Sequence, residues 1–206
     1  MIVGCVEPGS VFPDWGDGPV EVEIGPGRGG FALDYAALKL RMRIILIETR
    51  RADCELIRAR AARRGLANLE VVQGDARLLL PRMFAPGSLS GAHIQFPDPW
   101  WKTRHHKRRM VDVEFALLLR RLLKPGARVD FRTDVPAYFR EAVQTWLDAG
   151  FTRLPDAPPE VLSTRERRYA ITGQPVFRAS FENPGEDVRP IKSDRTGRDW
   201  RDHRRK

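Results

Sequence analysis

The chain has 206 residues, 42% of them hydrophobic, as is typical of one globular domain with a sizeable core. No apolar run approaches the length of a membrane span, and residues 1–18 make a poor signal peptide. Lysine and arginine number 36 against 27 aspartates and glutamates, and this net charge of +9 favours an acidic partner such as a nucleic acid.

Strand-like and helix-like segments alternate along most of the chain. Strands are expected at residues 19–25, 43–48, 69–75, 92–96, 127–134, 151–154 and 175–182. Helices are expected at residues 30–40, 52–66, 113–126 and 137–150. This alternation predicts an α/β fold, a Rossmann-like, doubly wound, mostly parallel sheet between two layers of helices.

Three parts of the chain differ in composition. Residues 1–18 form an N-terminal segment, residues 19–183 the α/β domain, and residues 184–206 a basic C-terminal tail without helical or strand periodicity. Cys5 and Cys54 are far apart, and neither they nor the four histidines have the spacing of metal ligands. We therefore expect two free thiols and no metal site.

A glycine-rich turn follows the first expected strand. The segment "EIGPGRGG" places Gly25, Gly27 and Gly29 between a strand and a helix, where the backbone can approach a ligand closely. The motif by itself fits a nicotinamide dinucleotide, S-adenosylmethionine or a purely structural turn.

Three carboxylates at strand ends narrow these alternatives. Glu23 precedes the glycines, Glu48 closes the second strand where it can accept ribose hydroxyls, and Asp75 closes the third where it can accept an adenine amino group. Each acid alone is equally typical of a solvated loop or a helix N-cap. Glu23 would repel a pyrophosphate but attract an aminoacyl sulfonium cation, so the three together favour S-adenosylmethionine.

The segment "FPDPWWKTRHHKRR" follows the fourth expected strand. Pro97 and Pro99 restrict the backbone on both sides of Asp98, which holds this carboxylate at the strand end near the expected cofactor site. Trp100 and Trp101 are equally compatible with stacking on a base and with core packing. The basic residues after them suggest a polyanionic partner, and the two histidines among them are expected to be hydrogen-bond donors or solvated groups rather than catalysts.

These segments, with "VEIGPGRGGF", "GDA", Thr133-Asp134 and "STRERRYAITGQPVFR", resemble the bacterial tRNA (guanine-N7)-methyltransferases over residues 20–182. The resemblance implies a class I methyltransferase fold with a seven-stranded sheet, a tRNA substrate and a cytoplasmic location. It also implies methyl transfer from S-adenosylmethionine to N7 of guanine 46 in the variable loop. Serine and arginine at positions 163 and 165 stand where the family usually has threonine and an aromatic residue, and Trp101 is unusual.

The resemblance also assigns roles to individual residues. It implies that the cofactor contacts Glu23, Gly25, Gly27, Gly29, Glu48, Asp75, Ala76 and Asp98, and that Asp98 is catalytic. It implies that the tRNA contacts Lys102, Arg104, His105, His106, Lys107, Arg108, Arg109, Asp134, Ser163, Thr164 and Glu166. The family contains monomers and homodimers, and both remain open here.

The chemistry of guanine N7 sets the role expected of Asp98. The N7 lone pair is unprotonated near neutral pH, so the reaction needs alignment more than a strong base. A fixed carboxylate can stabilise the positive charge that moves onto the purine. We therefore expect Asp98 to orient the base and stabilise charge rather than to accept a proton.

Four other functions were weighed against this one. An adenine-N6 methyltransferase would have adjacent prolines, whereas Asp98 separates them here. A nicotinamide-dependent oxidoreductase shares the glycine turn, but Glu23 would repel the pyrophosphate of its cofactor. The remaining alternatives are another S-adenosylmethionine-dependent RNA methyltransferase and a non-catalytic RNA-binding module that kept the fold.

Overall fold

The computed structural model describes residues 18–101 and 103–185. Predictions that concern residues 1–17, Lys102 and residues 186–206, including most of the basic tail, lie outside the described residues. The strands are β1 (Val20–Ile24), β2 (Arg43–Glu48), β3 (Leu69–Gln73), β4 (Leu89–Gln95), β5 (Leu123–Thr133), β6 (Thr152–Arg153) and β7 (Phe177–Glu182). The helices are α1 (Gly30–Leu38), α2 (Arg51–Arg63), α3 (Ala76–Met83), η1 (Thr103–Arg108, a 3-10 helix), α4 (Val113–Leu122), α5 (Pro136–Asp148) and α6 (Thr164–Thr172).

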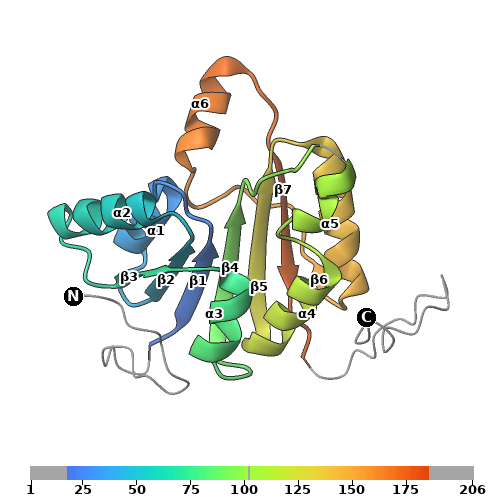
Figure 1. Ribbon diagram of the computed structural model, residues 1–206, viewed down its shortest axis with the longest axis horizontal. Coiled ribbons are helices and arrows are strands. Elements are labelled where there is room, and N and C mark those ends of the chain that lie inside the picture. Colours follow the sequence, from blue (N-terminus) through green and yellow to red (C-terminus); the bar gives the residue numbers. More distant parts are fainter. Residues whose placement is uncertain (1–17, 102, 186–206) are drawn as a thin grey trace.

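Within the described residues one seven-stranded sheet runs in the order β3-β2-β1-β4-β5-β7-β6 (Figure 1). The strands β1 to β5 are parallel, and β7 is antiparallel to both β5 and β6. Chain order reverses between β1 and β4, which places a ligand crevice at the carboxyl ends of these two strands. The predicted doubly wound, mostly parallel sheet is confirmed.

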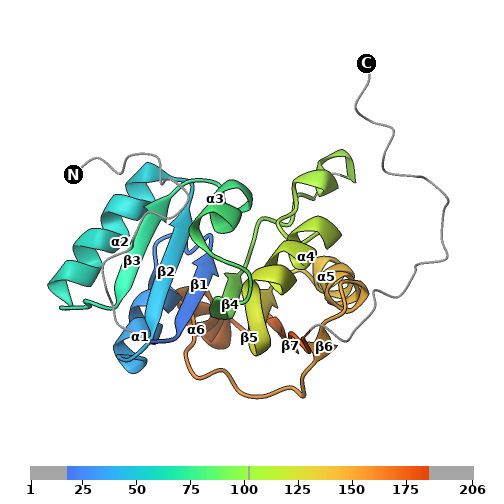
Figure 2. The same ribbon diagram turned by 90° about the horizontal axis from the view of Figure 1, so that it is seen from below.

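Helices cover both faces of the sheet, and each face buries its own core. The helices α3, α4 and α5 lie on one face and α1 and α6 on the other (Figure 2). The first face contains the larger core, in which the most deeply buried side chains include Phe115, Phe131, Trp146 and Phe181. The second face packs Phe31 and the rest of α1 against α2 and β2. These two cores confirm the predicted three-layer arrangement.

Several helix boundaries differ from the prediction. The helix α4 ends at Leu122, whereas the prediction placed its end at residue 126. Leu123 is already extended (ψ 139°), and the proline two residues later disfavours helical backbone at the residue before it. The helices α3 and α6 were not predicted. The helix α3 contains Pro81, and α6 is so polar that only Glu166 and Tyr169 of its side chains are buried.

A row of charged side chains is buried beneath α1. The register pairs His93 on β4 with Asp130 on β5, and both side chains lie on the same face as Glu21 on β1. His93 Nε2 is 2.8 Å from Glu21 Oε2, which also accepts a hydrogen bond from the Tyr35 hydroxyl. The other ring nitrogen, Nδ1, is 3.4 Å from Asp130 Oδ2. The imidazole therefore bridges two carboxylates on neighbouring strands.

These contacts shift the pKa values of His93 and Asp130. Burial by itself would lower the pKa of His93, but the hydrogen bonds to Asp130 and Glu21 outweigh it and raise that pKa to about 9. The same contacts outweigh the effect of burial on Asp130 and lower its pKa to about 2. Near neutral pH the structure therefore holds a buried imidazolium between carboxylates.

The raised pKa of His93 predicts a pH-dependent stability. The protonated imidazole contributes fully below its unfolded pKa, near 6.5, and this contribution is lost as pH rises through about 9. We expect the free energy of unfolding in urea to fall across this window by on the order of 1–3 kcal/mol. The variant His93→Gln should lack this component, and an unchanged pH slope in that variant would show that the imidazole is not the group involved.

Candidate active site

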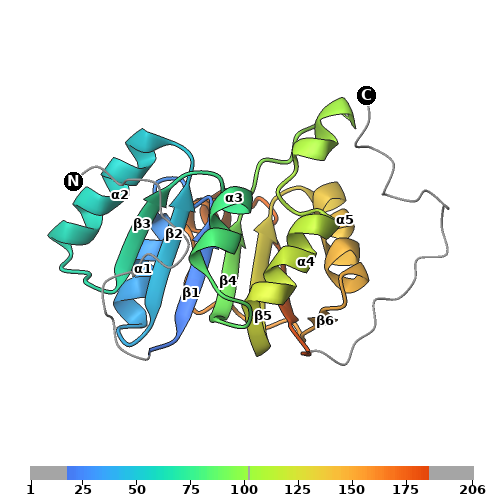
Figure 3. The same ribbon diagram turned by 60° about the horizontal axis from the view of Figure 1, so that its bottom comes forward.

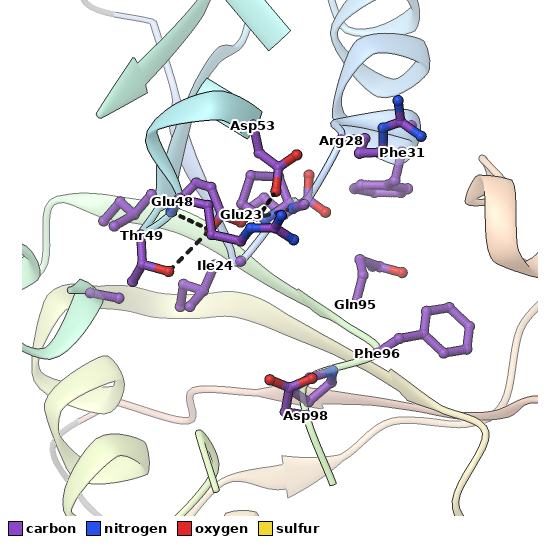
Figure 4. A pocket seen from close by; sticks show the side chains of 18 of the residues that line it. Glu23, Ile24, Arg28, Phe31, Glu48, Thr49, Asp53, Gln95, Phe96 and Asp98 are labelled. Atoms are coloured by element: carbon purple, nitrogen blue, oxygen red, sulfur yellow. Dashed lines mark hydrogen bonds and ion pairs between the residues drawn. The ribbon is translucent and has the colours of Figure 1, made fainter. Parts of the chain in front are cut away.

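A cleft of about 1070 Å³ opens at the carboxyl ends of β1, β2 and β4, beside the beginning of α6. This is the place that the reversal of strand order predicts. Many of the predicted site residues line it: Glu23, Gly25, Gly27, Glu48, Asp75, Ala76, Asp98, Arg108, Ser163 and Thr164. Figure 4 shows Glu23 and Glu48 on one side of the open centre and Asp98 on the other.

The glycine turn has a backbone that other residues rarely adopt. The φ angles of Gly25, Gly27 and Gly29 are 65°, 55° and 73°. A Cβ atom on Gly29 would lie 2.8 Å from the Ile57 side chain, so close packing also requires glycine there. No atom lies within 4 Å of a Cβ built on Gly25 or Gly27. These two glycines therefore leave room for a ligand, whereas Gly29 supports the turn from behind.

Glu48 fixes the shape of the turn from the end of β2. Its Oε2 accepts a hydrogen bond from the Gly27 amide at 3.0 Å, and its Oε1 accepts from the Arg50 amide at 2.9 Å. A carboxylate oxygen can accept more than one hydrogen bond, so Glu48 can also bind hydroxyl groups of a ligand. Asp75 caps α3 by accepting from the Arg77 amide at 2.8 Å, and it too borders the cleft.

Two buried polar side chains in the cleft have atoms without a partner. Glu23 is 1% exposed, and its Oε2 makes no hydrogen bond within the described residues. Gln95, at the end of β4, is also buried, and neither its Oε1 nor its Nε2 makes a hydrogen bond within these residues. Leaving such atoms unsatisfied costs about 1–3 kcal/mol each. Both residues line the cleft, so they fit a polar ligand with hydrogen-bond donors and acceptors. Gln95 was not predicted from the sequence.

The pKa of Glu23 reflects the same burial. Desolvation raises it from the usual value near 4.5 to about 7, against the opposing effects of His93 and Arg132. The carboxyl group is therefore about half ionised near neutral pH. A cationic ligand beside it would favour the ionised form and replace the missing partner.

The Pro97–Pro99 segment lies between two residues in the left-handed region. Phe96 has φ 51° and Trp100 has φ 47°, conformations that cost roughly 1–3 kcal/mol each for residues other than glycine. Asp98 between them is exposed and lines the cleft. The surrounding structure stabilises these conformations and thereby fixes the backbone that carries Asp98 at the edge of the cleft.

The basic strip after this segment divides into two parts. Its first part forms η1, which includes the backbone of Arg104, His105, His106, Lys107 and Arg108; Lys102 lies outside the described residues. The Arg108 guanidinium lies 5.1 Å above the Trp100 ring, and His105 contacts the edge of the same ring. Trp101 is 75% exposed, Trp100 is half-buried, and neither belongs to the two hydrophobic cores. Trp100 and its cationic neighbour border the cleft and are available to a base.

Arg109, in contrast, points inward. It is 7% exposed, its guanidinium lies 4.8 Å above the Tyr138 ring, and it forms an ion pair with Glu141. Its Nε donates a hydrogen bond to the Pro99 carbonyl oxygen at 2.8 Å. The structure therefore places Arg109 behind the Asp98 segment and not on the surface with Arg108.

The predicted tRNA-contacting residues around Ser163 also differ in whether they line the cleft. Ser163 and Glu166 form a capping box at the start of α6, in which each side chain accepts a hydrogen bond from the other residue's backbone amide. Glu166 is 2% exposed, and its two oxygens also bind Arg132 and Arg178 at 2.6 and 2.8 Å. The cleft thus receives Ser163 and Thr164 but not Glu166.

Asp134 lies behind the cleft. Its Oδ2 accepts a 2.6 Å hydrogen bond from the Tyr169 hydroxyl and lies 3.7 Å from the Arg165 guanidinium. Arg165, where the resemblance leads one to expect an aromatic residue, covers the Phe96 ring at 5.0 Å and lines the cleft. The substitution therefore retains a flat group against the segment that carries the catalytic candidate.

Residues 18–101 and 103–185 contain no group of three or more histidine, cysteine or acidic side chains that could hold a metal ion. They also contain no helix that is long and apolar enough to cross a membrane. Cys54 is buried with its thiol free, and burial raises the pKa of that thiol.

Comparisons with known proteins identify the family. Residues 17–179 match a family model described as a putative methyltransferase. A tRNA (guanine-N(7)-)-methyltransferase of Anaeromyxobacter dehalogenans is 49% identical over 82% of this chain and 90% of its own length. One of the same name from Myxococcus xanthus is 42% identical over 84% of this chain and 89% of its own length.

This chain belongs to the tRNA (guanine-N7)-methyltransferase family. The solved structure of the aminoglycoside resistance methyltransferase NpmB1 has the same fold, with a TM-score of 0.58, 22% identity, and coverage of 80% of this chain and 86% of that one. The chain is therefore an enzyme and a methyltransferase, and neither an oxidoreductase nor a non-catalytic module.

The position of Arg109 generates a prediction about turnover. Arg109→Met removes the hydrogen bond to Pro99, so the Asp98 carboxylate loses its alignment and the turnover number should fall about 10- to 100-fold. The affinity for the methyl donor should not change, because Arg109 does not line the cleft. Steady-state kinetics and a separate donor-binding titration measure the two effects.

Two further variants serve as controls for this measurement. Arg109→Lys retains the charge near Glu141 but lacks the Nε donor, so it should share the turnover defect. Arg108→Met changes an exposed neighbour and should instead raise KM for the acceptor. A defect of Arg109→Met that lies in KM alone would contradict the positioning role.

Proposed function

We propose that this enzyme transfers the methyl group of S-adenosylmethionine to N7 of a guanine in tRNA, guanine 46 of the variable loop. One observation carries the proposal: a carboxylate fixed between two prolines, Asp98, borders the same cleft as the buried, unpartnered Glu23. The names of the relatives, which specify tRNA and guanine N7, support this choice of acceptor.

The cleft residues fit the donor group by group. Glu48 would accept the ribose hydroxyls and Asp75 the adenine amino group, while Gly25 and Gly27 allow the backbone to approach. Glu23 would pair with the ammonium of the aminoacyl group, which supplies the partner that its Oε2 lacks. When bound, the cofactor supplies an electrophilic methyl group on a sulfonium.

The residues near Asp98 are suited to orienting a purine. Guanine N7 carries its lone pair in the ring plane and has no proton to lose, so the enzyme needs alignment and charge stabilisation. The Asp98 carboxylate would stabilise the positive charge on the methylated purine. Trp100, with Arg108 on its face, offers a surface on which the exposed base can stack.

The proposal predicts one product. Tritiated S-adenosylmethionine and unmodified tRNA should yield 7-methylguanosine, identified by mass and retention, and the label should disappear when guanine 46 is replaced. Asp98→Asn should retain binding of both substrates but lose at least about 100-fold in turnover, by analogy with removal of one fixed electrostatic group. A different methylated nucleoside would identify another RNA methyltransferase activity.

The raised pKa of Glu23 predicts that donor binding depends on pH. Only the ionised carboxylate attracts an ammonium group, so affinity for S-adenosylmethionine should rise as pH increases from 6 to 8, through the pKa near 7. Calorimetric titration across this range measures the effect. Glu23→Gln should bind weakly at every pH in the range, and a pH dependence that persists in this variant would assign the titration to another group.

A further inference from the structure

A second group of cations borders the cleft on the side away from η1. Arg28 belongs to the glycine turn, and Arg60 and Arg63 lie on α2; all three line the cleft. The helix α2 and the green 3-10 turn that follows β4 lie on opposite sides of the sheet's carboxyl end in two views (Figures 1 and 3). The cleft therefore has a basic border on each side.

Most arginines around α2 have partners within the protein. Arg51 pairs with Glu55 at 2.7 Å, and Arg64 pairs with Asp34 at 2.8 Å. Arg60 donates a 2.6 Å hydrogen bond to the Arg28 carbonyl oxygen, which holds the glycine turn against α2. Arg51, Arg60 and Arg64 thus each have a partner within the protein.

Arg28 and Arg63 differ from their neighbours. Both side chains are exposed at the cleft, and no acidic side chain in the described part of the chain forms an ion pair with either of them. Of the acids on this side of the cleft, Glu48 binds the glycine turn, Asp53 pairs with Arg50, and Glu23 is buried and forms no ion pair with Arg28 or Arg63. The two guanidinium groups thus remain available to an anion outside the protein.

The proposed donor does not require these two cations. It carries one carboxylate, and its ammonium and sulfonium groups make its net charge positive, so it can pair with at most one of two arginines. An RNA chain, in contrast, carries one phosphate per nucleotide and binds exposed arginines with release of counterions. The excess positive charge on this side therefore fits the acceptor rather than the donor.

We propose that Arg28 and Arg63 form a second phosphate-binding surface, so that the RNA substrate spans the cleft from η1 to α2. This inference rests on the proposed RNA acceptor. Phosphate contacts on both sides of the cleft would fix the direction of the strand over Asp98 without reading its sequence.

The test is the salt dependence of RNA binding by Arg28→Gln/Arg63→Gln. Filter binding of unmodified tRNA at several salt concentrations should show an affinity roughly 25-fold lower at 0.1 M salt, since each phosphate contact releases about 0.7 of a counterion and so contributes about a factor of five there. The slope of log K against log salt should decrease by about 1.4–1.8 for two lost contacts. The matched control is Arg82→Gln/Arg121→Gln, which removes the same charge from the last turns of α3 and α4.

The outcomes separate this surface from its alternatives. A lower affinity and slope in the first variant alone, with donor affinity and melting temperature unchanged, is the expected result. Equal effects in both variants would mean that net charge and not this surface is responsible, and an unchanged slope would overturn the proposal. A loss confined to S-adenosylmethionine binding would also overturn it and assign the arginines to the donor.

Failure of the proposed function has a different signature. If the wild-type enzyme makes no 7-methylguanosine but binds tRNA with a slope that the first variant reduces, the acceptor base is wrong and the RNA surface stands. If the wild-type product is 7-methylguanosine and the two proteins bind tRNA identically, the function stands and the surface is wrong.

Discussion

The buried guanidinium of Arg132, at the end of β5, connects the segments that build the cleft. Its Nη1 binds Glu166 at 2.6 Å and the Val161 carbonyl at 2.9 Å, while its face covers the Phe31 ring of α1 at 5.1 Å. The carbonyl of the same residue accepts the Phe96 amide at 2.8 Å. Removing one partner of such a pair leaves an uncompensated buried charge, so the packing of α6 against α1 depends on this side chain, while the backbone of the same residue holds the start of the Asp98 segment.

This connection also affects the chemistry of the site. Arg132 and the imidazolium of His93 both lower the pKa of Glu23, opposing the desolvation that raises it. Both charges therefore favour the ionised form of the Glu23 carboxyl group. The charged row beneath α1 thus maintains the state in which Glu23 can receive a cation, although His93 itself does not line the cleft.

Arginine serves two purposes in this protein, and only burial and partners distinguish them. Arg109 and Arg132 are buried and hold backbone carbonyls or carboxylates in place. Arg104, Arg108, Arg28 and Arg63 are exposed at or near the cleft. Because guanidinium can form several directed hydrogen bonds while remaining charged, the same residue type suits both roles. The net charge of +9 therefore does not by itself tell which cations face a partner.

The sequence by itself determined the order of strands and helices, the glycine turn and the acids at strand ends. Each of these depends on local periodicity or backbone preference, which neighbouring residues carry. It did not reveal α6, although Ser163 and Glu166 have the spacing of a capping box, because a helix with almost no apolar face lacks periodicity.

Only the tertiary structure decided which side chains reach the cleft. Gln95 belongs to no motif, and it lines the cleft because β4 lies beside β1 in the sheet. Arg109 and Glu166 do not line the cleft, because they pair with charged side chains of α5, β5 and β7. Burial and pairing depend on contacts between segments that are far apart in the chain, and no local pattern in the sequence records those contacts.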